Sequence, residues 1–279
     1  MNGNYILLVK CPDETGLIYK ITKLLYSNGL NIVRNREFVS EDTKTFFMRT
    51  EIIGKLNKTK ILKDLKKNLP SNSTIKLNTS EKKNIIVMAS REHHCLSELL
   101  IQHFYNDINI HINAIISNHN NLKNISNKFG IPFFYMPVKN MTREEHEKSI
   151  IEILNSYNFD YIALAKYMRI FTPAFAKKYK NRIINIHHSF LPAFIGADPY
   201  VQAFNRGVKI IGATAHFVNE NLDEGPIIVQ NVIPINHTYN SASMQKAGQT
   251  IEKNVFVKAI ELVAADRVFI NNNKTIVFD

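Results

Sequence analysis

The chain of 279 residues has no tryptophan and only two cysteines, Cys11 and Cys95. The two thiols lie far apart and without the short spacing of a metal-binding pair, so neither a disulfide framework nor a cysteine-based metal site is indicated. Thiols in such an arrangement are typical of a reducing compartment. We therefore expect a cytoplasmic protein that holds no metal.

Long apolar segments are also absent. No stretch approaches the roughly 20 apolar residues that cross a bilayer. The N-terminal sequence MNGNYILLVK lacks a basic segment followed by a long apolar run, so no signal peptide is indicated. A content of 45% hydrophobic and 21% charged residues is ordinary for a soluble globular protein. The length allows one or two domains, and we expect no membrane partner.

Acidic residues are few relative to basic ones: 24 Asp and Glu stand against 35 Lys and Arg, which gives a formal net charge of +11. The pI of about 9.5 would suit a nucleic-acid partner. However, the lysines are dispersed, through residues 55–83 and elsewhere, and no recognition module accompanies them. We therefore expect no nucleic-acid partner. A simpler use of the charge is attraction of a polyanionic small substrate.

The first 80 residues alternate between strand-like and helical patterns. Leu17, Ile21 and Leu25 recur at helical spacing after the turn PDETG, and Asn28-Gly29 closes this helix. The other predicted elements are strands at 5–10, 31–38, 45–53 and 73–77 and a helix at 58–68. The resulting order, β-α-β-β-α-β, is the ferredoxin-like pattern.

Beyond the polar stretch 78–83, strands and helices alternate. The predicted strands are 84–90, 110–117, 131–136 and 161–165, and the predicted helices are 94–105, 122–129 and 143–157, the last with a capping box from Thr142 to Glu145. A hairpin-like pair at 210–218 and 227–235 extends the sheet, and a helix at 243–265 and a strand at 275–278 finish it. The alternation predicts a mostly parallel, doubly wound Rossmann-like α/β sheet with helices on both faces. We expect two domains, 1–80 and 84–279.

An apolar strand that begins at Arg182 ends in polar side chains. Asn185 and His187 are two residues apart, so in a strand they project from the same face, whereas His188 faces the other way and is expected to pack. Downstream, Asp223 lies in the turn LDEGP, where a carboxylate can be aimed. An amide, an imidazole and a carboxylate supply the oxyanion stabilisation and proton transfer that acyl transfer requires. A lone histidine at a strand end is nevertheless more often structural.

Ligand sites in open parallel sheets form outside the carboxyl ends of the strands. Three candidate segments lie at such ends: 165–171, 185–189 and 219–225. We expect these segments to build the site.

Three motifs together resemble the formyltransferase fold family: NIHHSFLP (185–192), GATAHFV (212–218) and LDEGP (222–226). This family includes glycinamide ribonucleotide formyltransferase, methionyl-tRNA formyltransferase and formyltetrahydrofolate deformylase. The resemblance maps the family's catalytic Asn–His–Asp set onto Asn185, His187 and Asp223. His216 would orient Asp223 or join the proton relay, although a structural histidine is at least as common at such a position.

The segment LAKYMRI (164–170) is similar to the folate-binding segment of that family. The resemblance implies pterin contacts from Met168 and Ile170 and a contact between Arg169 and the benzoyl-glutamate region. The loop that begins with Val218 and Asn219 would bind the pterin largely through its backbone. Without the resemblance, a Met/Tyr/Arg cluster after a strand is more often a helix start with packing residues. The implied substrate is 10-formyltetrahydrofolate, with no permanently bound cofactor and no metal.

The turn ASREHHC (89–95) contains no glycine. Family members that formylate glycinamide ribonucleotide need a phosphate cradle there, and bulky side chains with Glu92 make a poor backbone nest for phosphate. The chain thus resembles the deformylase branch, over nearly its whole length. That resemblance implies hydrolysis to tetrahydrofolate and formate, which feeds purine biosynthesis and balances the one-carbon pool. Asp223 would assist the water, and His187 and Asn185 would stabilise the oxyanion.

Two other interpretations stay open at this point. A folate-dependent enzyme that transfers the formyl group to an amine acceptor would use the same fold and the same polar set. A non-catalytic module that binds amino acids or nucleic acid would use neither the triad nor the folate segment.

Residues 5–80 also resemble an ACT domain, a module that commonly binds amino acids, with CPDETGL as its first turn. Asp13 and Gly16 lie in this turn, and the N–H groups of the helix that follows could receive a carboxylate or amide. The resemblance implies an amino-acid effector and a site shared between subunits of a homo-oligomer. The fold alone hosts many functions.

Asp198 and Val201 depart from the pattern, because relatives usually have a basic residue and a histidine there. A basic group at 198 would help to hold the glutamate tail or the next subunit. We expect these departures to affect affinity or assembly, since the catalytic set is untouched.

Overall fold

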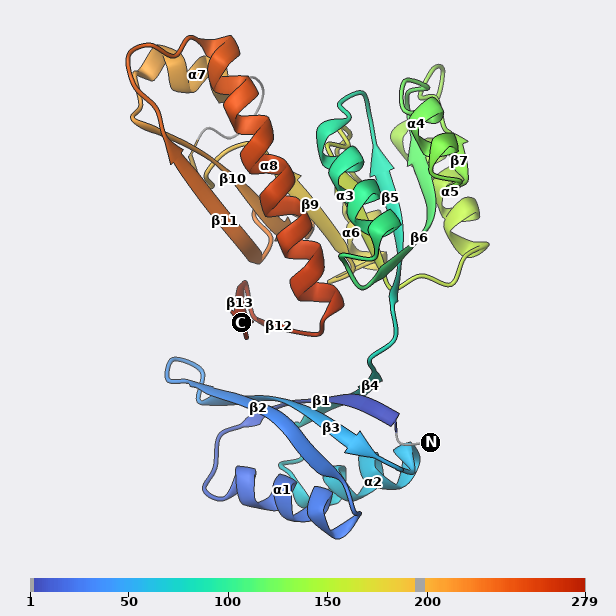
Figure 1. Ribbon diagram of the computed structural model, residues 1–279, viewed down its shortest axis with the longest axis vertical. Helices are drawn as coiled ribbons and strands as arrows, with labels where there is room; N and C mark the ends of the chain where they lie inside the picture. Colours follow the sequence, from blue (N-terminus) through green and yellow to red (C-terminus); the bar gives the residue numbers. More distant parts are fainter. Residues whose placement is uncertain (1–2, 194–198, 279) are drawn as a thin grey trace. The chain divides into compact units, whose positions relative to one another are not determined.

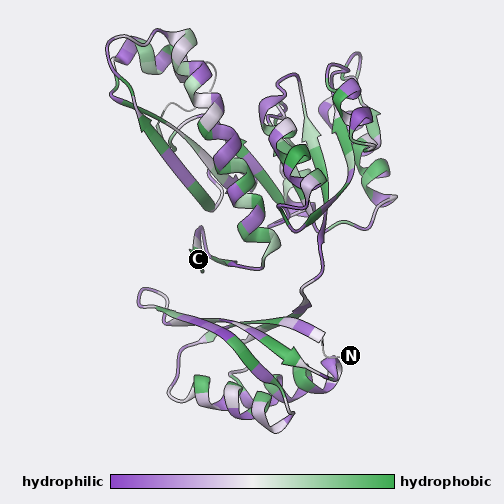
Figure 2. Cartoon of the chain, viewed as in Figure 1, coloured by the Kyte–Doolittle hydropathy of each residue, from purple (hydrophilic) through white to green (hydrophobic). Residues whose placement is uncertain are grey.

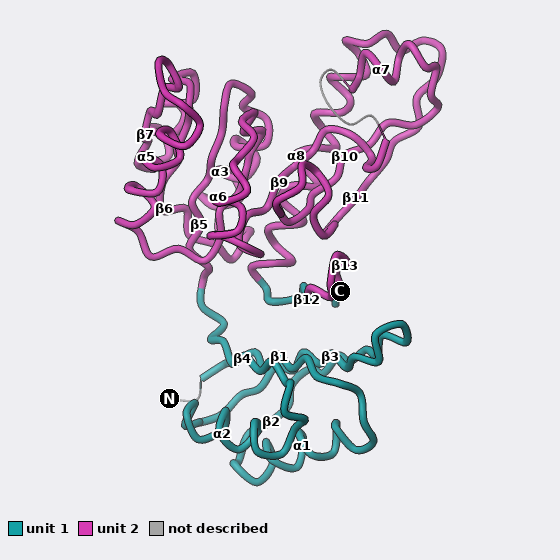
Figure 3. The backbone as a smooth tube through the Cα atoms, turned by 180° about the vertical axis from the view of Figure 1, so that it is seen from behind, with its two compact units in different colours: residues 1–81, 265–269, 278–279 teal, residues 82–264, 270–277 magenta. Residues whose placement is uncertain are grey.

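The computed structural model describes residues 3–193 and 199–278. The chain divides into two compact units (Figure 3). The first comprises residues 1–81 with 265–269 and 278–279, and the second comprises residues 82–264 with 270–277. Each unit has its own sheet and its own hydrophobic core.

The first unit is an antiparallel sheet covered by two helices. Its elements are β1 (Gly3–Pro12), α1 (Leu17–Ser27), β2 (Asn31–Ser40), β3 (Thr45–Gly54), α2 (Lys58–Asn68) and β4 (Thr74–Thr79). The strand order is β2-β3-β1-β4 with antiparallel pairing, and α1 and α2 lie on the same side of the sheet (Figure 1). The predicted ferredoxin-like order is confirmed.

The core of this unit lies between the sheet and the two helices. Leu7 and Val9 alternate along β1 so that both face the helices, and Ile21 and Leu25 of α1 meet them at helical spacing. Gly16 begins α1 with a φ of 87°, in the left-handed region that glycine enters without steric cost.

The chain segment after the last helix also belongs to this unit. Arg49 of β3 is buried and donates hydrogen bonds to the carbonyls of Asp266 (Nε to O, 3.0 Å) and Ala265 (Nη2 to O, 2.9 Å). Phe47, on the same face of β3, packs edge to face on Phe269 at 5.5 Å between ring centroids. These contacts occupy the face of the sheet opposite the helices.

The second unit is built on a larger sheet. Its strands are β5 (Lys83–Ala89), β6 (Ile110–Ser117), β7 (Phe133–Tyr135), β8 (Tyr161–Ala165), β9 (Ile183–His187), β10 (Ile210–Phe217) and β11 (Ile227–Pro234). Among the described residues their order is β11-β10-β9-β8-β5-β6-β7. The strands from β9 to β7 run parallel, whereas β10 is antiparallel to both β9 and β11. The prediction of a mostly parallel sheet is confirmed.

Helices cover both faces of this sheet. They are α3 (His94–Tyr105), α4 (Lys123–Lys128), α5 (Arg143–Asn155), α6 (Pro173–Lys178), α7 (Pro199–Arg206) and α8 (Ser241–Ala264). Ile86 and Met88 of β5 pack with Ile150 of α5 and Phe175 of α6, so the alternate side chains of β5 face the opposite layer. Helices α3 and α8 contact each other, and α8 also contacts β9, β10 and β11. Figure 2 shows α3 and α8 with alternating hydrophilic and hydrophobic segments, as expected of helices that bury one side.

Several local predictions can be compared with these elements. The capping box from Thr142 to Glu145 begins α5 as expected. Helices α6 and α7 were not predicted, because six and eight residues give too little periodicity to recognise. The C-terminal strand does not extend the large sheet as expected, since β13 (Lys274–Val277) pairs with β12 (Val268–Asn271) in a separate hairpin.

Within the described ranges, no helix is both long enough and apolar enough to cross a membrane.

Candidate active site

A pocket of about 320 Å³ opens beside the carboxyl ends of β8 and β9. Its lining residues come from three segments: 164–171 at and after the end of β8, 185–188 at the end of β9, and 216–223 at and after the end of β10. Strand pairing explains why these segments meet, because β9 lies between β8 and β10 in the sheet. The three segments are those that the sequence places at strand ends.

Asn185 and His187 are held at the end of β9. Pairing with β10 sets Asn185 opposite His216 and His187 opposite Thr214. His187 is buried, with 6% of its surface exposed, and Asn185 is half-buried. Both line the pocket, in agreement with their two-residue spacing on a strand.

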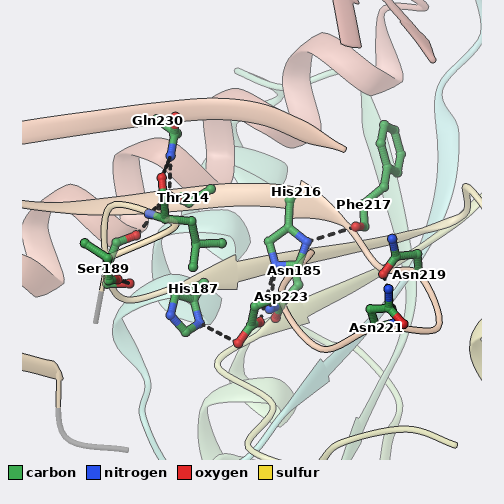
Figure 4. A network of polar contacts seen from close by, with 12 residues as sticks. Asn185, His187, Ser189, Thr214, His216, Phe217, Asn219, Asn221, Asp223 and Gln230 are labelled. Carbon is green, nitrogen blue, oxygen red and sulfur yellow. Dashed lines mark hydrogen bonds and ion pairs between the residues drawn. The ribbon is translucent and has the colours of Figure 1, made fainter. Parts of the chain in front are cut away.

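Asp223 reaches the same point from the turn between β10 and β11. It takes a left-handed conformation with a φ of 57°, and its carboxylate lies 3.3 Å from His187 (Oδ2 to Nδ1) and 3.5 Å from His216 (Oδ1 to Nε2) (Figure 4). Gly225 permits this close return, because a Cβ atom there would overlap the carbonyl oxygen of Phe217. The turn therefore delivers a carboxylate between two imidazoles.

Two opposing effects set the charge of Asp223. Burial by itself would raise the pKa of the carboxyl group, but the hydrogen bonds and charges of His187 and His216 outweigh burial and hold the pKa well below its usual range. Asp223 is therefore ionised at any physiological pH.

The tautomer of His216 follows from its neighbours. Its Nδ1 lies 2.9 Å from the carbonyl oxygen of Phe217, which can only accept, so Nδ1 carries a proton. In neutral His216 the other nitrogen, Nε2, then accepts from the amide of Asn185 at 3.3 Å. A second proton on Nε2 would instead be donated to Asp223. His216 can therefore exchange a proton with the carboxylate.

His187 has an unused nitrogen. Its Nδ1 faces Asp223, while its buried Nε2 has no hydrogen-bond partner among the described residues. A buried ring nitrogen without a hydrogen bond destabilises the fold unless a bound ligand supplies the missing partner. The Nε2 atom is therefore available to a polar atom of a bound molecule.

His188 lies at the boundary between this pocket and a smaller one beside Tyr200. Burial, the charge of Lys166 and the neighbouring His187 lower the pKa of His188 to about 4. Its ring packs 6.2 Å from that of Tyr200. A neutral, packed imidazole is the result.

The segment after β8 forms the apolar wall of the pocket. Met168 and Ile170 are 60% and 51% exposed, an unusual exposure for apolar side chains that line a concave site. Arg169, Val218 and Asn219 line the pocket with them. The structure thus brings the five residues implied in folate binding into one cavity, next to Asn185, His187, His216 and Asp223.

Thr214 was not anticipated, although it supports the site directly. This buried residue donates to the carbonyl of Ser189 at 2.9 Å and accepts from the backbone N–H of Leu191 at 3.1 Å and from Gln230 at 2.9 Å (Figure 4). These bonds fix the chain as it leaves His187. The sequence could have indicated Thr214 through its two-residue spacing from His216, because residues with this spacing share a face of a strand.

A buried polar cluster that the sequence pattern does not indicate adjoins the pocket. Among the described residues, His94, Cys95 and Glu252 bring potential ligand atoms within 4.8 Å of one another, although the sequence spacing of the cysteines does not indicate a metal site. Lys166 already places its ammonium 3.2 Å from the Glu252 carboxylate. Burial and the nearby Glu252 raise the pKa of the Cys95 thiol, which disfavours the thiolate that a metal requires.

The remaining predicted positions lie elsewhere. Asp13 and Gly16 lie in the turn before α1 of the first unit, where the Asp13 N–H donates to the carbonyl of Lys44 at 2.8 Å. Val201 lies on α7 with 47% of its surface exposed. Asp198 lies outside the described residues.

Residues 83–260 match the formyl transferase family, and residues 5–70 match the ACT domain. A formyltetrahydrofolate deformylase from Haemophilus influenzae is 51% identical over 272 residues, which cover 98% of this chain and 98% of that protein. The chain belongs to the formyltetrahydrofolate deformylase family. It is therefore a hydrolase, and the predicted resemblance is confirmed.

Solved structures agree with membership of the formyltetrahydrofolate deformylase family. The crystal structure of a formyltetrahydrofolate deformylase from Pseudomonas syringae pv. tomato has a TM-score of 0.95 and 34% identity, and the match covers 100% of this chain and 95% of that one. A glycinamide ribonucleotide transformylase from Symbiobacterium toebii has a TM-score of 0.68 and 29% identity, and the match covers only 71% of this chain and 95% of that one. The deformylase family thus accounts for the full length, including the ACT domain.

Proposed function

We propose that this chain hydrolyses 10-formyltetrahydrofolate to tetrahydrofolate and formate. The observation that supports this most is the His187–Asp223 contact at 3.3 Å inside the pocket, with His187 Nε2 left without a partner among the described residues. Folate would lie along Met168 and Ile170, with Arg169 toward the benzoyl-glutamate region. Val218 and Asn219 would face the pterin mainly through their backbone.

Catalysis begins with a water molecule held by Asp223. The water oxygen attacks the formyl carbon, and the negative charge that develops on the formyl oxygen is stabilised by the amide of Asn185 and by the Nε2–H of His187, which carries a proton on each ring nitrogen at this step. Its low pKa makes Asp223 a weak base before attack. The oxyanion that forms nearby raises that pKa, since like charges disfavour each other, so the carboxylate can then accept the proton of the water.

Collapse of the tetrahedral intermediate completes the reaction. The bond between the formyl carbon and N10 breaks, and a proton delivered through Asp223, His187 or His216 neutralises the leaving nitrogen. His216 suits this relay because its Nε2 lies 3.5 Å from Asp223. Formate leaves with the oxygen that came from water.

Water is favoured over an amine acceptor by the charges at the start of α3. Glu92 lies 3.5 Å from Nδ1 of His94, and Glu252 lies 2.8 Å from its Nε2. Lys166 compensates the charge of the buried Glu252, so the partly exposed Glu92 carboxylate is the group that would repel an anionic acceptor such as a phosphorylated amine. Transfer to an amine is therefore the less favoured function.

The first unit would supply regulation. An amino acid would bind near Asp13 and Gly16, at a site shared between subunits of a homo-oligomer. In the cytoplasm the reaction would feed formate to purine biosynthesis and balance the one-carbon pool. No metal or permanently bound cofactor enters this scheme.

Product analysis in H₂¹⁸O tests the proposal. Purified chain with 10-formyltetrahydrofolate, and no other acceptor, should release tetrahydrofolate and formate in equal amounts, with one ¹⁸O in each formate. Formyl transfer that strictly requires an added amine would show that the proposed hydrolysis is wrong.

A further inference from the structure

Glu252 is the centre of a buried polar cluster that no step of the proposed reaction uses. It lies on α8 with 1% of its surface exposed, and its carboxylate receives hydrogen bonds from His94 (Nε2 to Oε2, 2.8 Å) and Tyr200 (OH to Oε1, 2.5 Å). Lys166 places Nζ 3.2 Å from Oε2. The four groups come from α3, α7, α8 and the turn after β8.

The chain is shaped to admit these contacts. Gly248 lies one turn before Glu252 on α8, and a Cβ atom there would overlap the Tyr200 hydroxyl. Burial would raise the pKa of the Glu252 carboxyl, but His94, Lys166 and Tyr200 outweigh it and lower the pKa to about 2. The buried carboxylate is therefore ionised, and Lys166, itself 4% exposed, is its counter-ion.

Lys166 occupies a critical point of the backbone. It has a φ of 59°, in the left-handed region that lysine rarely adopts. Such a backbone conformation persists only where surrounding contacts hold it. The chain turns there, and two residues later the Met168 N–H donates to Oγ of Ser90 at 3.0 Å. The exposed side chains of Met168 and Ile170 then form the apolar wall of the pocket.

The ion pair thus fixes the residue from which this wall starts. We propose that the Lys166–Glu252 pair positions the Met168–Ile170 wall for folate, which makes Lys166 and Glu252 positioning residues. This inference rests on the proposed function for the identity of the ligand. A merely structural pair would affect the stability of the protein, whereas a positioning pair also affects substrate affinity.

A double-mutant cycle separates these roles. Lys166→Met or Glu252→Gln alone leaves one buried charge uncompensated and lowers thermal stability. The double variant removes both charges, so its melting temperature should return toward that of the unmodified chain. Its KM for 10-formyltetrahydrofolate should nevertheless stay about tenfold higher, with kcat within about twofold, because the wall is no longer anchored.

Lys253→Met is the matched control. Lys253 is the next residue on α8 and pairs on the surface with Glu98 at 3.3 Å, so its loss should leave KM unchanged. A double variant in which KM recovers together with the melting temperature would overturn the proposal. So would an unchanged KM in all variants that fold.

Equilibrium binding of tetrahydrofolate keeps the inference separate from the proposed reaction. The dissociation constant of the double variant should rise about as much as KM. If the unmodified chain released no formate, the proposed function would fail, and the ion pair would be judged on tetrahydrofolate binding alone. Equal tetrahydrofolate affinity in the unmodified chain and the double variant would then overturn the inference.

Discussion

The imidazole of His187 and the carboxylate of Asp223 face each other in the pocket, with Nδ1 3.3 Å from Oδ2. The two residues come from different elements: His187 ends the parallel strand β9, and Asp223 lies in the turn after the antiparallel strand β10. Their contact depends on how closely that turn returns to β10. Small changes in the turn should therefore affect chemistry more than folding.

Gly225→Ala should remove activity while the fold survives. The added methyl group would overlap the Phe217 carbonyl, so the turn must shift and carry Asp223 away from His187. A displacement of this kind should lower kcat about a hundredfold. Steady-state kinetics and far-UV circular dichroism measure the two effects.

Gly130→Ala is the control for the preceding substitution. Gly130 has a φ of 68°, and an added methyl group would meet no atom of the described residues within 4 Å, so any cost there is conformational and local. It should leave kcat unchanged. Full activity of Gly225→Ala would contradict the role given to the turn.

Met168→Ala and Ile170→Ala should each weaken substrate binding. The two side chains supply exposed apolar surface in the pocket but hold no proton, so KM should rise several-fold, roughly 1 kcal/mol of lost contact, with little change in kcat. Ile101→Ala removes a comparably exposed isoleucine from α3, outside the pocket, and should change neither constant. A fall in kcat without a change in KM would contradict this assignment.

Thr214→Val should disturb the chain that leaves His187. The substitution keeps the shape but leaves the Ser189 carbonyl and the Leu191 N–H without their buried partner, at a cost of about 1–3 kcal/mol in the free energy of unfolding. We expect kcat/KM to fall about tenfold as His187 loses support. Thr214→Ser retains the hydroxyl and should behave like the unmodified chain; equal effects of both variants would point to packing instead.

The stabilising effect of Glu252 should depend on pH. Its pKa is lowered from 4.5 to about 2, so its contribution is fully present above pH 4.5 and is lost as the pH falls toward 2. The shift corresponds to roughly 3 kcal/mol at 1.36 kcal/mol per unit. Urea unfolding of the unmodified chain and of Glu252→Gln should differ most near neutral pH. A difference that grows as the pH falls would contradict the assignment.

Much of the fold was accessible from the sequence because its signals are local. Short apolar runs and strand-like composition predicted β1 to β4 and the parallel strands, and the Thr142–Glu145 capping box located the start of α5. Asn185 and His187 share a strand face, which predicts that both line one cavity. The motif LDEGP by itself predicts a carboxylate that a turn can aim, whereas its pairing with an imidazole was implied only by the family resemblance.

The missed features depend on contacts between distant segments. Lys166 and Glu252 have no periodic relation in the sequence, and only packing of α8 near the turn after β8 joins them. Thr214 resembles any small residue in an apolar strand until Ser189 and Gln230 are placed beside it. The sequence could not show that β13 pairs with β12 in a separate hairpin and does not join the large sheet. Strands of four residues are too short to indicate which strand they pair with.

Formate release by Asp223→Asn tests the central claim most directly. With no acceptor other than water, the unmodified chain should convert 10-formyltetrahydrofolate completely. Asp223→Asn should bind tetrahydrofolate with similar affinity yet lose at least about a hundredfold in kcat, because the amide cannot accept the proton of the water. Hydrolysis by this variant at the rate of the unmodified chain would contradict the account.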